Sequence, residues 1–233
     1  MARSIFIGDV HGCAPELEDL LAKVGPAAGD AVYFVGDLVA RGPDTAGVLR
    51  LFREVHARGV LGNHEARLLD VRRARLSGES TTKMGPTHEA LLAALPAEEW
   101  ALLEGLPLFL EVPEHGALVV HAGLAPGIPV REQAPWTLLH IRSLEGGVPS
   151  ASAGDASWSE HYRGAPHIVF GHDARRGLQL RSDATGLDSA CVYGGSLTAL
   201  VLPRNAPLPP PAERAALLVS VRARAAYYTN HTT

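Results

Sequence analysis

Short apolar runs alternate with amphipathic stretches along most of this chain. Each run has six residues or fewer, and most are rich in Val, Ile or Phe. Such lengths and residue types are typical of strands buried on both faces. The sequence therefore predicts six strands, at residues 4–7, 31–35, 60–61, 117–120, 167–170 and 197–202.

Two stretches between these runs have the apolar spacing of helices, with side chains repeating at three- and four-residue intervals. The repeating positions are Leu17, Leu20, Leu21 and Val24 in one stretch, and Val48, Leu49, Phe52 and Val55 in the other. Pro15 lies near the start of the first stretch and Gly25 follows its end, as is usual at helix boundaries. Strands alternating with helices predict a layered α/β fold.

The remaining segments predict how the chain is divided. Residues 65–104 are mostly helical in pattern, with a break of Ser, Thr and Gly at 77–85. A Pro-rich stretch at 206–211 precedes a helical pattern over 212–226. We expect one catalytic domain over 1–205, with a helical insertion at about 65–105. A Pro-rich linker and a C-terminal helix would follow in 206–233.

Composition excludes several classes of protein. The 233 residues are 46% apolar and 20% charged, with a net charge of −4, so nothing global attracts nucleic acid or an anionic membrane. No signal peptide and no apolar run of membrane-spanning length is visible. Cys13 and Cys191 are too few for a disulfide framework, which favours a reducing, cytoplasmic location.

The candidate chemistry lies at the ends of the predicted strands, where five separate segments carry Asp, Asn or His beside glycine. These residues are Asp9, His11, Asp37, Asn63, His64, His121 and His172. In open α/β sheets, ligand sites form outside the carboxyl ends of strands. A single Gly-Asp after a strand is usually a turn or a helix cap, but five such coincidences favour a common site.

Six of these side chains form a plausible metal-binding set: Asp9, His11, Asp37, Asn63, His121 and His172. Asp9 and His11 are two residues apart, so on an extended chain both point to the same side. The set is too large for one tetrahedral zinc ion and suits two ions that share a carboxylate. Mixed oxygen and nitrogen donors favour Mn²⁺, Fe, Zn²⁺, Ni²⁺ or Co²⁺ over Ca²⁺ or Mg²⁺.

The same motifs resemble, in order, those of the calcineurin-like metallophosphoesterases. They are GDVHG (8–12), GDLVARG (36–42), GNHE (62–65), HAGL (121–124) and GH (171–172). Within that family they look like the phosphoprotein phosphatase branch, which includes Ser/Thr protein phosphatases and bacterial symmetrical diadenosine tetraphosphate hydrolases. The resemblance implies a four-layer α-β-β-α sandwich with a helical insertion after the third strand. It also implies two divalent transition-metal ions, Mn²⁺ first among them.

The resemblance also implies roles for individual residues. Asp9, His11, Asp37 and His172 would hold one ion, and a second would be held by Asn63, His121, a further His and Asp37 as the bridge. A hydroxide between the ions would attack phosphorus in line.

His64 would donate a proton to the leaving oxygen, while Arg41 would bind two phosphate oxygens. Arg142, Tyr193 and Asn63 are further candidates for substrate contacts.

Ala40 bears on the choice of substrate. Protein phosphatases of this branch carry Asp where this chain has Ala40, and that Asp hydrogen-bonds the catalytic His. Alanine there, like residues 186–200, resembles the dinucleotide hydrolases, whose phosphate leaving group depends less on a general acid. Glu65 and the short chain resemble the protein phosphatases instead. The sequence therefore predicts a hydrolase of dinucleoside polyphosphates or related phosphoesters, with a Ser/Thr or broad-specificity protein phosphatase as the alternative.

Two further classes rank lower. A non-catalytic metal-binding scaffold need not retain both His64 and Arg41. A nuclease would need a basic groove with stacking aromatic side chains, whereas aromatic residues are 6% of this acidic chain. The expected partner is a phosphorylated small molecule or a phosphoprotein, with neither a membrane nor a nucleic acid.

Overall fold

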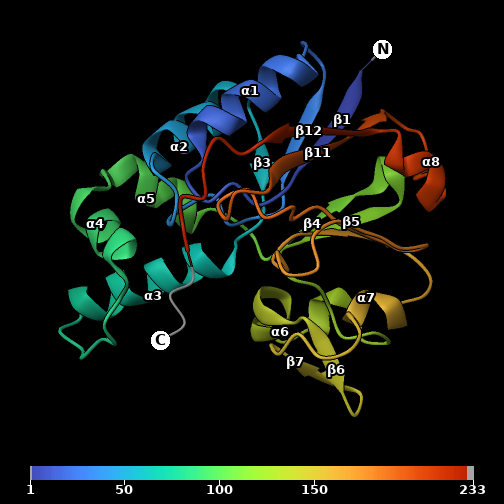
Figure 1. Ribbon diagram of the computed structural model, residues 1–233. Coiled ribbons are helices and arrows are strands. Elements are labelled where there is room, and N and C mark those ends of the chain that lie inside the picture. The colour runs from blue at the N-terminus through green and yellow to red at the C-terminus, as the bar shows by residue number, and fades with distance from the viewer. Residues whose placement is uncertain (1, 230–233) are drawn as a thin grey trace.

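Two five-stranded β-sheets form the centre of the molecule, and helices lie against the outer face of each. The computed structural model describes residues 2–229. Figure 1 shows the layers in order, with α1 and α2 above the first sheet and α6 and α7 below the second. The predicted α/β class and four-layer sandwich are confirmed.

The first sheet has the spatial order β12-β11-β1-β2-β3. Its strands are β1 (Arg3–Ile7), β2 (Ala31–Phe34), β3 (Arg58–Gly59), β11 (Ser196–Pro203) and β12 (Leu218–Arg222). Neighbours among β1, β2 and β3 are parallel, whereas β11 pairs antiparallel with both β1 and β12. The carboxyl ends of three strands therefore lie at one edge.

The second sheet has the order β4-β5-β8-β10-β9. Its strands are β4 (Phe109–Val112), β5 (Ala117–Val120), β8 (His167–Phe170), β9 (Gln179–Leu180) and β10 (Ala184–Gly186). Here β8 pairs parallel with both β5 and β10, so this sheet also has three parallel strands at its centre. A separate hairpin joins β6 (Ser143–Glu145) to β7 (Val148–Ser150).

Apolar side chains fill the space between the two sheets. Phe6 and Tyr33 of the first sheet stack with ring centroids 5.0 Å apart, and they belong to one cluster with Val119 and Val169 of the second sheet. All four side chains are buried. Burial of this kind, at roughly 25 cal/mol per Å² of apolar surface, holds the two sheets together and fixes where their edges meet.

Amphipathic helices cover the outer faces. α1 (Ala14–Val24) and α2 (Thr45–Glu54) pack their buried leucines and valines against the first sheet. Pro15 lies in the first turn of α1, and Gly25 ends the helix in a left-handed conformation, with φ 57°. α6 (Pro135–His140) and α7 (Trp158–His161) lie beyond the second sheet.

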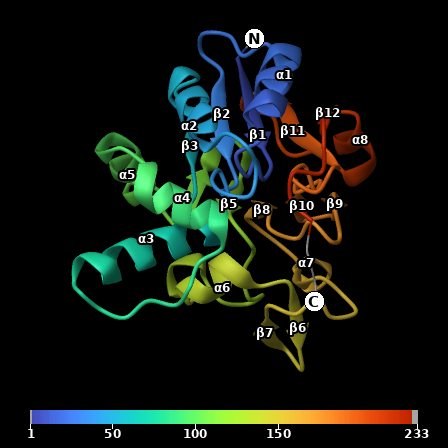
Figure 2. The same cartoon turned by 60° about the vertical axis from the view of Figure 1, so that its left-hand side comes forward.

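The predicted helical insertion contains three helices, which Figure 2 shows together at one end of the sandwich. They are α3 (Asn63–Leu76), α4 (Pro86–Ala94) and α5 (Ala97–Glu104). An ion pair between Arg75 and Glu89, with N···O 2.7 Å, attaches α4 to α3. Short 3₁₀ turns occur at Pro113–His115 and Val130–Glu132. None of the helices described is long and apolar enough to cross a membrane.

The C-terminal helix predicted over residues 212–226 is wrong. Only α8 (Pro211–Ala215) is helical, and β12 follows it. Val219 and Val221 pack toward the α1 side of the sheet while Leu218 packs between the sheets, so an extended chain buries apolar side chains on both faces. The strand predicted at 60–61 lies two residues earlier, at Arg58–Gly59, because Leu61 leaves the sheet to donate its N–H to Pro107.

Candidate metal centre and phosphate pocket

The site lies where the carboxyl ends of the six parallel strands meet, three from each sheet. Each strand end is followed by polar residues within a few positions. The residues are Asp9 and His11 after β1, Asp37 after β2, Asn63 and His64 after β3, His121 after β5, His172 after β8 and Asp188 after β10. The two-sheet architecture thus brings together all the metal-ligand candidates of the sequence.

Asp37 is at the centre of this group and is almost fully buried. Its Oδ2 atom lies 3.3 Å from His11 Nε2 and 3.5 Å from His121 Nε2. Its Oδ1 atom accepts the backbone N–H of His64, at 3.0 Å, in the first turn of α3. One carboxylate therefore faces imidazoles that come from both sheets.

His121, His172 and Asn63 form a second group beside Asp37. Asn63 Oδ1 lies 3.0 Å from His121 Nε2 and 3.1 Å from His172 Nδ1. His121 Nδ1 lies 2.9 Å from the carbonyl oxygen of Val35, which orients the ring and leaves Nε2 facing the site. The resemblance placed His172 with Asp9 and His11, but its ring atoms group with His121 and Asp37.

Asp9 and His11 form the first group together with Asp37. Asp9 Oδ2 accepts the backbone N–H of His172 at 2.9 Å, while its Oδ1 atom has no hydrogen-bond partner among the described residues. His11 Nδ1 lies 3.3 Å from the carbonyl oxygen of Val39, so its Nε2 atom faces Asp37. Both side chains are buried, and an unpartnered buried carboxylate oxygen is costly unless it has a cation to bind.

The backbone at the site has an unusual conformation. His11, Asp37, Ala40, Arg41 and His172 all have φ between 48° and 70°, in the left-handed region that non-glycine residues rarely adopt. Such conformations persist only where surrounding contacts hold them. Close packing is part of this, because a Cβ atom on the glycine before His172 would collide with Asp9 Oδ1.

Glu65 supplies several of these contacts. Its buried carboxylate accepts backbone N–H groups from Asp37 at 3.0 Å, Val39 at 2.9 Å and Gly62 at 2.9 Å. It therefore ties the loop after β2 to the start of α3. This role was not predicted, although Glu at the third position of a helix commonly binds backbone N–H groups at the helix start.

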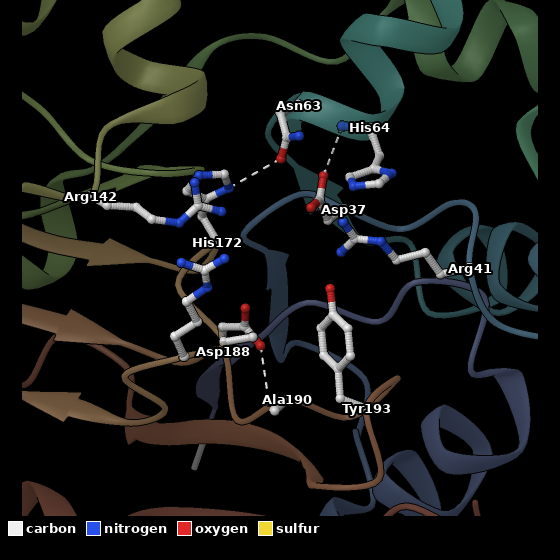
Figure 3. Close-up of a pocket in the computed structure, with 11 residues that line it drawn as sticks. Asp37, Arg41, Asn63, His64, Arg142, His172, Asp188, Ala190 and Tyr193 are labelled. Carbon is white, nitrogen blue, oxygen red and sulfur yellow. Dashed lines mark hydrogen bonds between the residues drawn. The ribbon is translucent and has the colours of Figure 1, made fainter. Parts of the chain in front are cut away.

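A pocket of about 430 Å³ opens in front of these residues (Figure 3). Arg41 and Arg142 enter it from opposite sides, and Asp37 and His64 lie at its inner wall. The Arg41 guanidinium lies over the rings of Tyr193, at 5.5 Å, and Tyr228, at 5.2 Å. All the residues predicted to contact substrate therefore line one pocket: Arg41, Arg142, Tyr193 and Asn63.

Two charged pocket residues were missed from the sequence. Asp188 is buried, and its Oδ1 atom accepts the N–H of Ala190 at 3.0 Å. It follows β10, whose sequence Ala-Thr-Gly lacks the bulky apolar residues that would have predicted a strand. Arg175 also lines the pocket, three residues after His172. The rule of polar residues after strands would have found Asp188 if β10 had been recognised.

Burial disfavours the charged forms of the ionisable side chains in the site. It raises the pKa of Asp37 and of Asp188 to about 7, and it lowers the pKa of His121 to about 4. The pKa of Asp9 is also raised, by burial and by the neighbouring charges of Asp188 and Asp37. Cations bound among these groups would relieve the repulsion between the carboxylates and bind the neutral imidazoles.

A family model for calcineurin-like phosphoesterases matches residues 2–195, so the chain belongs to that family. It is 30% identical to a protein of Paraburkholderia phymatum named symmetrical bis(5'-nucleosyl)-tetraphosphatase, over 87% of this chain and 90% of that protein. It is 32% identical to the protein of the same name from Ralstonia nicotianae, over 83% of this chain and 87% of that one.

Solved structures agree with this assignment. A crystal structure provisionally described as a diadenosine tetraphosphatase superimposes with a TM-score of 0.80 at 37% identity, covering 95% of this chain and 93% of that one. A Ser/Thr phosphatase from Saccharomyces cerevisiae gives a TM-score of 0.57 at 18% identity, over 98% and 82% of the two chains, which shows a shared fold alone. The chain is therefore a metal-dependent phosphohydrolase.

Proposed function

We propose that the protein hydrolyses dinucleoside polyphosphates, or related phosphoesters and anhydrides, at this centre. The observation that carries the proposal is the arrangement of two ligand groups around Asp37, directly behind a pocket lined by arginines. One group contains His11, Asp37 and His64, and the other contains Asp37, His121 and His172.

The donors fit two divalent ions. Asp9, His11 and Asp37 would hold one ion, whereas Asp37, Asn63, His121 and His172 would hold the other. Asp9 Oδ1 and His172 Nε2 are buried without hydrogen-bond partners among residues 2–229, as expected of atoms in a site built for cations. The mixture of nitrogen and oxygen donors suits Mn²⁺, which is our first candidate, and equally Fe, Zn²⁺, Ni²⁺ and Co²⁺.

When bound, two such ions supply an activated water for attack on phosphorus and neutralise charge on the phosphate. The chain supplies the remaining functions. Arg41 and Arg142, on opposite walls, would bind phosphate oxygens and set the direction of attack. The two tyrosine rings keep the Arg41 guanidinium in place. His64, beside Asp37, would donate a proton to the oxygen that leaves as its bond to phosphorus breaks.

Ala40 and the pocket arginines support an anhydride substrate. A phosphate leaving group needs little help from a general acid, and the side chain of Ala40 cannot strengthen His64 as an acid. A third arginine, Arg175, gives the pocket more positive charge than one phosphate requires. The names of the relatives in P. phymatum and R. nicotianae point to the same substrate class.

A protein phosphatase is the second candidate. Glu65, which holds the loop after β2 against α3, is the residue that resembles that branch. The pocket volume of about 430 Å³ also leaves room for a phosphorylated side chain. The two buried free thiols, Cys13 and Cys191, fit action in the cytoplasm for either substrate.

An assay with Mn²⁺ separates these functions. Purified protein would be given diadenosine tetraphosphate, ADP and a phosphoserine peptide at equal concentrations, and the products would be quantified. We expect the highest kcat/KM with diadenosine tetraphosphate, with ADP as product. Preference for the peptide would favour the second candidate, and no hydrolysis of any of the three would refute the proposal.

A further inference from the structure

His88, on helix α4, makes the one side-chain contact to the His64 ring that has hydrogen-bond geometry among the described residues. His64 Nδ1 lies 3.0 Å from His88 Nε2. The two rings are 5.0 Å apart between centroids and inclined by only 26°. The other ring against His64 is that of His11, edge-on at 4.8 Å and 82°, so His64 is held between the metal centre and α4.

Two positions could have supplied a carboxylate partner for His64, and neither does. The first is position 40, where the resemblance implies an aspartate. The residue there is Ala40, which is buried and donates its N–H to Thr45 Oγ1. Glu65 is next to His64 in sequence, but both of its oxygens accept backbone N–H groups. His88 is thus the partner that the fold provides.

The inserted helix that carries His88 is attached on two sides. Glu89 pairs with Arg75 of α3, at 2.7 Å, and Thr87 Oγ1 accepts the backbone N–H of Arg41 at 3.4 Å. Helix α4 therefore contacts both the proposed proton donor and the loop of the phosphate-binding arginine. Its position can control the direction in which His64 points.

We propose that His88 is a positioning residue for His64. A hydrogen bond at Nδ1 fixes the tautomer and the ring plane, which presents Nε2 to the leaving oxygen. A second imidazole replaces the carboxylate of the protein phosphatases, and it orients His64 without adding negative charge beside it. This inference rests on the proposed function, because only a phosphohydrolase gives His64 a leaving oxygen to protonate.

The test compares His88→Ala with His88→Gln, whose amide can reach the place of the imidazole Nε2 atom. Each variant would be assayed with Mn²⁺ on phenyl phosphate, which has a poor leaving group, and on 4-nitrophenyl phosphate, which has a better one. We expect His88→Ala to lower kcat on phenyl phosphate by about 10-fold or more. The loss on 4-nitrophenyl phosphate should be much smaller, KM should stay within about two-fold, and His88→Gln should recover most of the loss.

Ala93→Gln is the matched control, since it places the same new residue at an exposed position of α4 and alters neither His64 nor the contacts that attach the helix. It should behave as the unmutated protein on both esters. A ¹⁵N NMR spectrum of ring-labelled histidines, recorded without metal, gives an independent measure of the contact. The His64 Nδ1 resonance should move in His88→Ala and stay near its original position in His88→Gln.

Three results would overturn the inference: equal kcat losses on both esters in His88→Ala, a change in KM alone, or an unmoved His64 resonance. Failure of the proposed function looks different. In that case the unmutated protein would hydrolyse neither ester while the resonance still moved, and the contact would then have no role in catalysis.

Discussion

At the scale of single residues, Asp37 belongs to both ligand groups of the candidate metal centre. It faces His11 and His121 through one oxygen and accepts the N–H of His64 through the other. Its φ of 50° is held by the contacts that Glu65 makes around it. Because the Asp37 carboxylate makes all of these contacts, removing its charge should disrupt the arrangement of the surrounding histidines.

We predict that Asp37→Asn lowers kcat/KM by more than about 100-fold, because the amide removes the charge that both ions would share. Elemental analysis of the purified variant should find at least one metal ion fewer per chain than in the unmutated protein. Asp155→Asn changes an exposed carboxylate and should alter neither quantity. Normal turnover by Asp37→Asn would exclude the bridging role.

At the scale of elements, the C-terminal segment takes part in the site. After β12 the chain returns to the loop after β10, where the N–H of Tyr228 is donated to the carbonyl oxygen of Val192 at 3.0 Å. The rings of Tyr228 and Tyr193 pack edge to face with their centroids 6.0 Å apart, and both lie against the Arg41 guanidinium. The segment thus holds an arginine that comes from a loop nearly two hundred positions away.

Tyr228→Ala should therefore raise KM for phosphorylated substrates by about 2- to 5-fold, which corresponds to the loss of one cation–π contact. Tyr228→Phe retains the ring face and should leave KM near its original value. Steady-state kinetics on the two variants measures the difference. Equal KM values for Ala and Phe would mean that the ring does not help to hold Arg41.

A second element-scale prediction concerns the ends of β1, β2 and α1. Burial alone would raise the pKa of Asp30, but hydrogen bonds from Arg3 and from the N–H of Ala27 lower it to about 2. Arg3 also donates to the carbonyl oxygens of Val24 and Gly25 at the end of α1. This group of contacts joins three elements.

Because the pKa of Asp30 is lower in the folded state, its ionised form stabilises the protein above the unfolded value of 3.8, and the contribution is lost as pH falls toward 2. Asp30→Asn should lower the free energy of unfolding by about 1–2 kcal/mol at pH 7, after solvent screening at Arg3, whose side chain is 30% exposed. Denaturant titrations at pH 7 and pH 3 measure this difference, which should shrink at the lower pH. An equal difference at both values would contradict the assignment.

At the scale of the whole molecule, the candidate metal centre lies between the two sheets. Asp9 and Asp37 come from the first sheet, while His121 and His172 come from the second. Ions bound between these side chains would therefore stabilise the folded protein as a whole, because the pair of ions would contact residues from both sheets. Burial also raises the pKa values of Asp9 and Asp37, which makes their ionised forms costly. Bound cations would lower that cost.

We expect Mn²⁺ at about 100 times its Kd to stabilise the fold by about 2.7 kcal/mol. This corresponds to a rise in Tm of roughly 5–10 °C for a chain of this size. Calorimetry with Mn²⁺ and with a chelator measures the shift, and Asp37→Asn should show a smaller one. Identical Tm values under the two conditions would argue against ions linking the sheets.

Much of this organisation could be predicted from local sequence. Apolar runs identified the strands on which the site depends, and polar residues after those runs identified its main side chains. The predictions failed where local pattern and final environment differ. β10 has only three residues and no bulky apolar side chain, so Asp188 was missed. β12 lies within a stretch rich in Ala and Arg, residues 212–226, whose overall composition favours a helix.

The sequence by itself determined which chemical groups are present and where each lies relative to a strand, since strand length and apolar periodicity are local properties. Only the tertiary structure decided which of these groups meet. His88 next to His64, Tyr228 against Arg41 and His172 beside His121 are contacts between segments far apart in the chain. No local pattern encodes such distances, because they follow from how two sheets and an inserted helix pack.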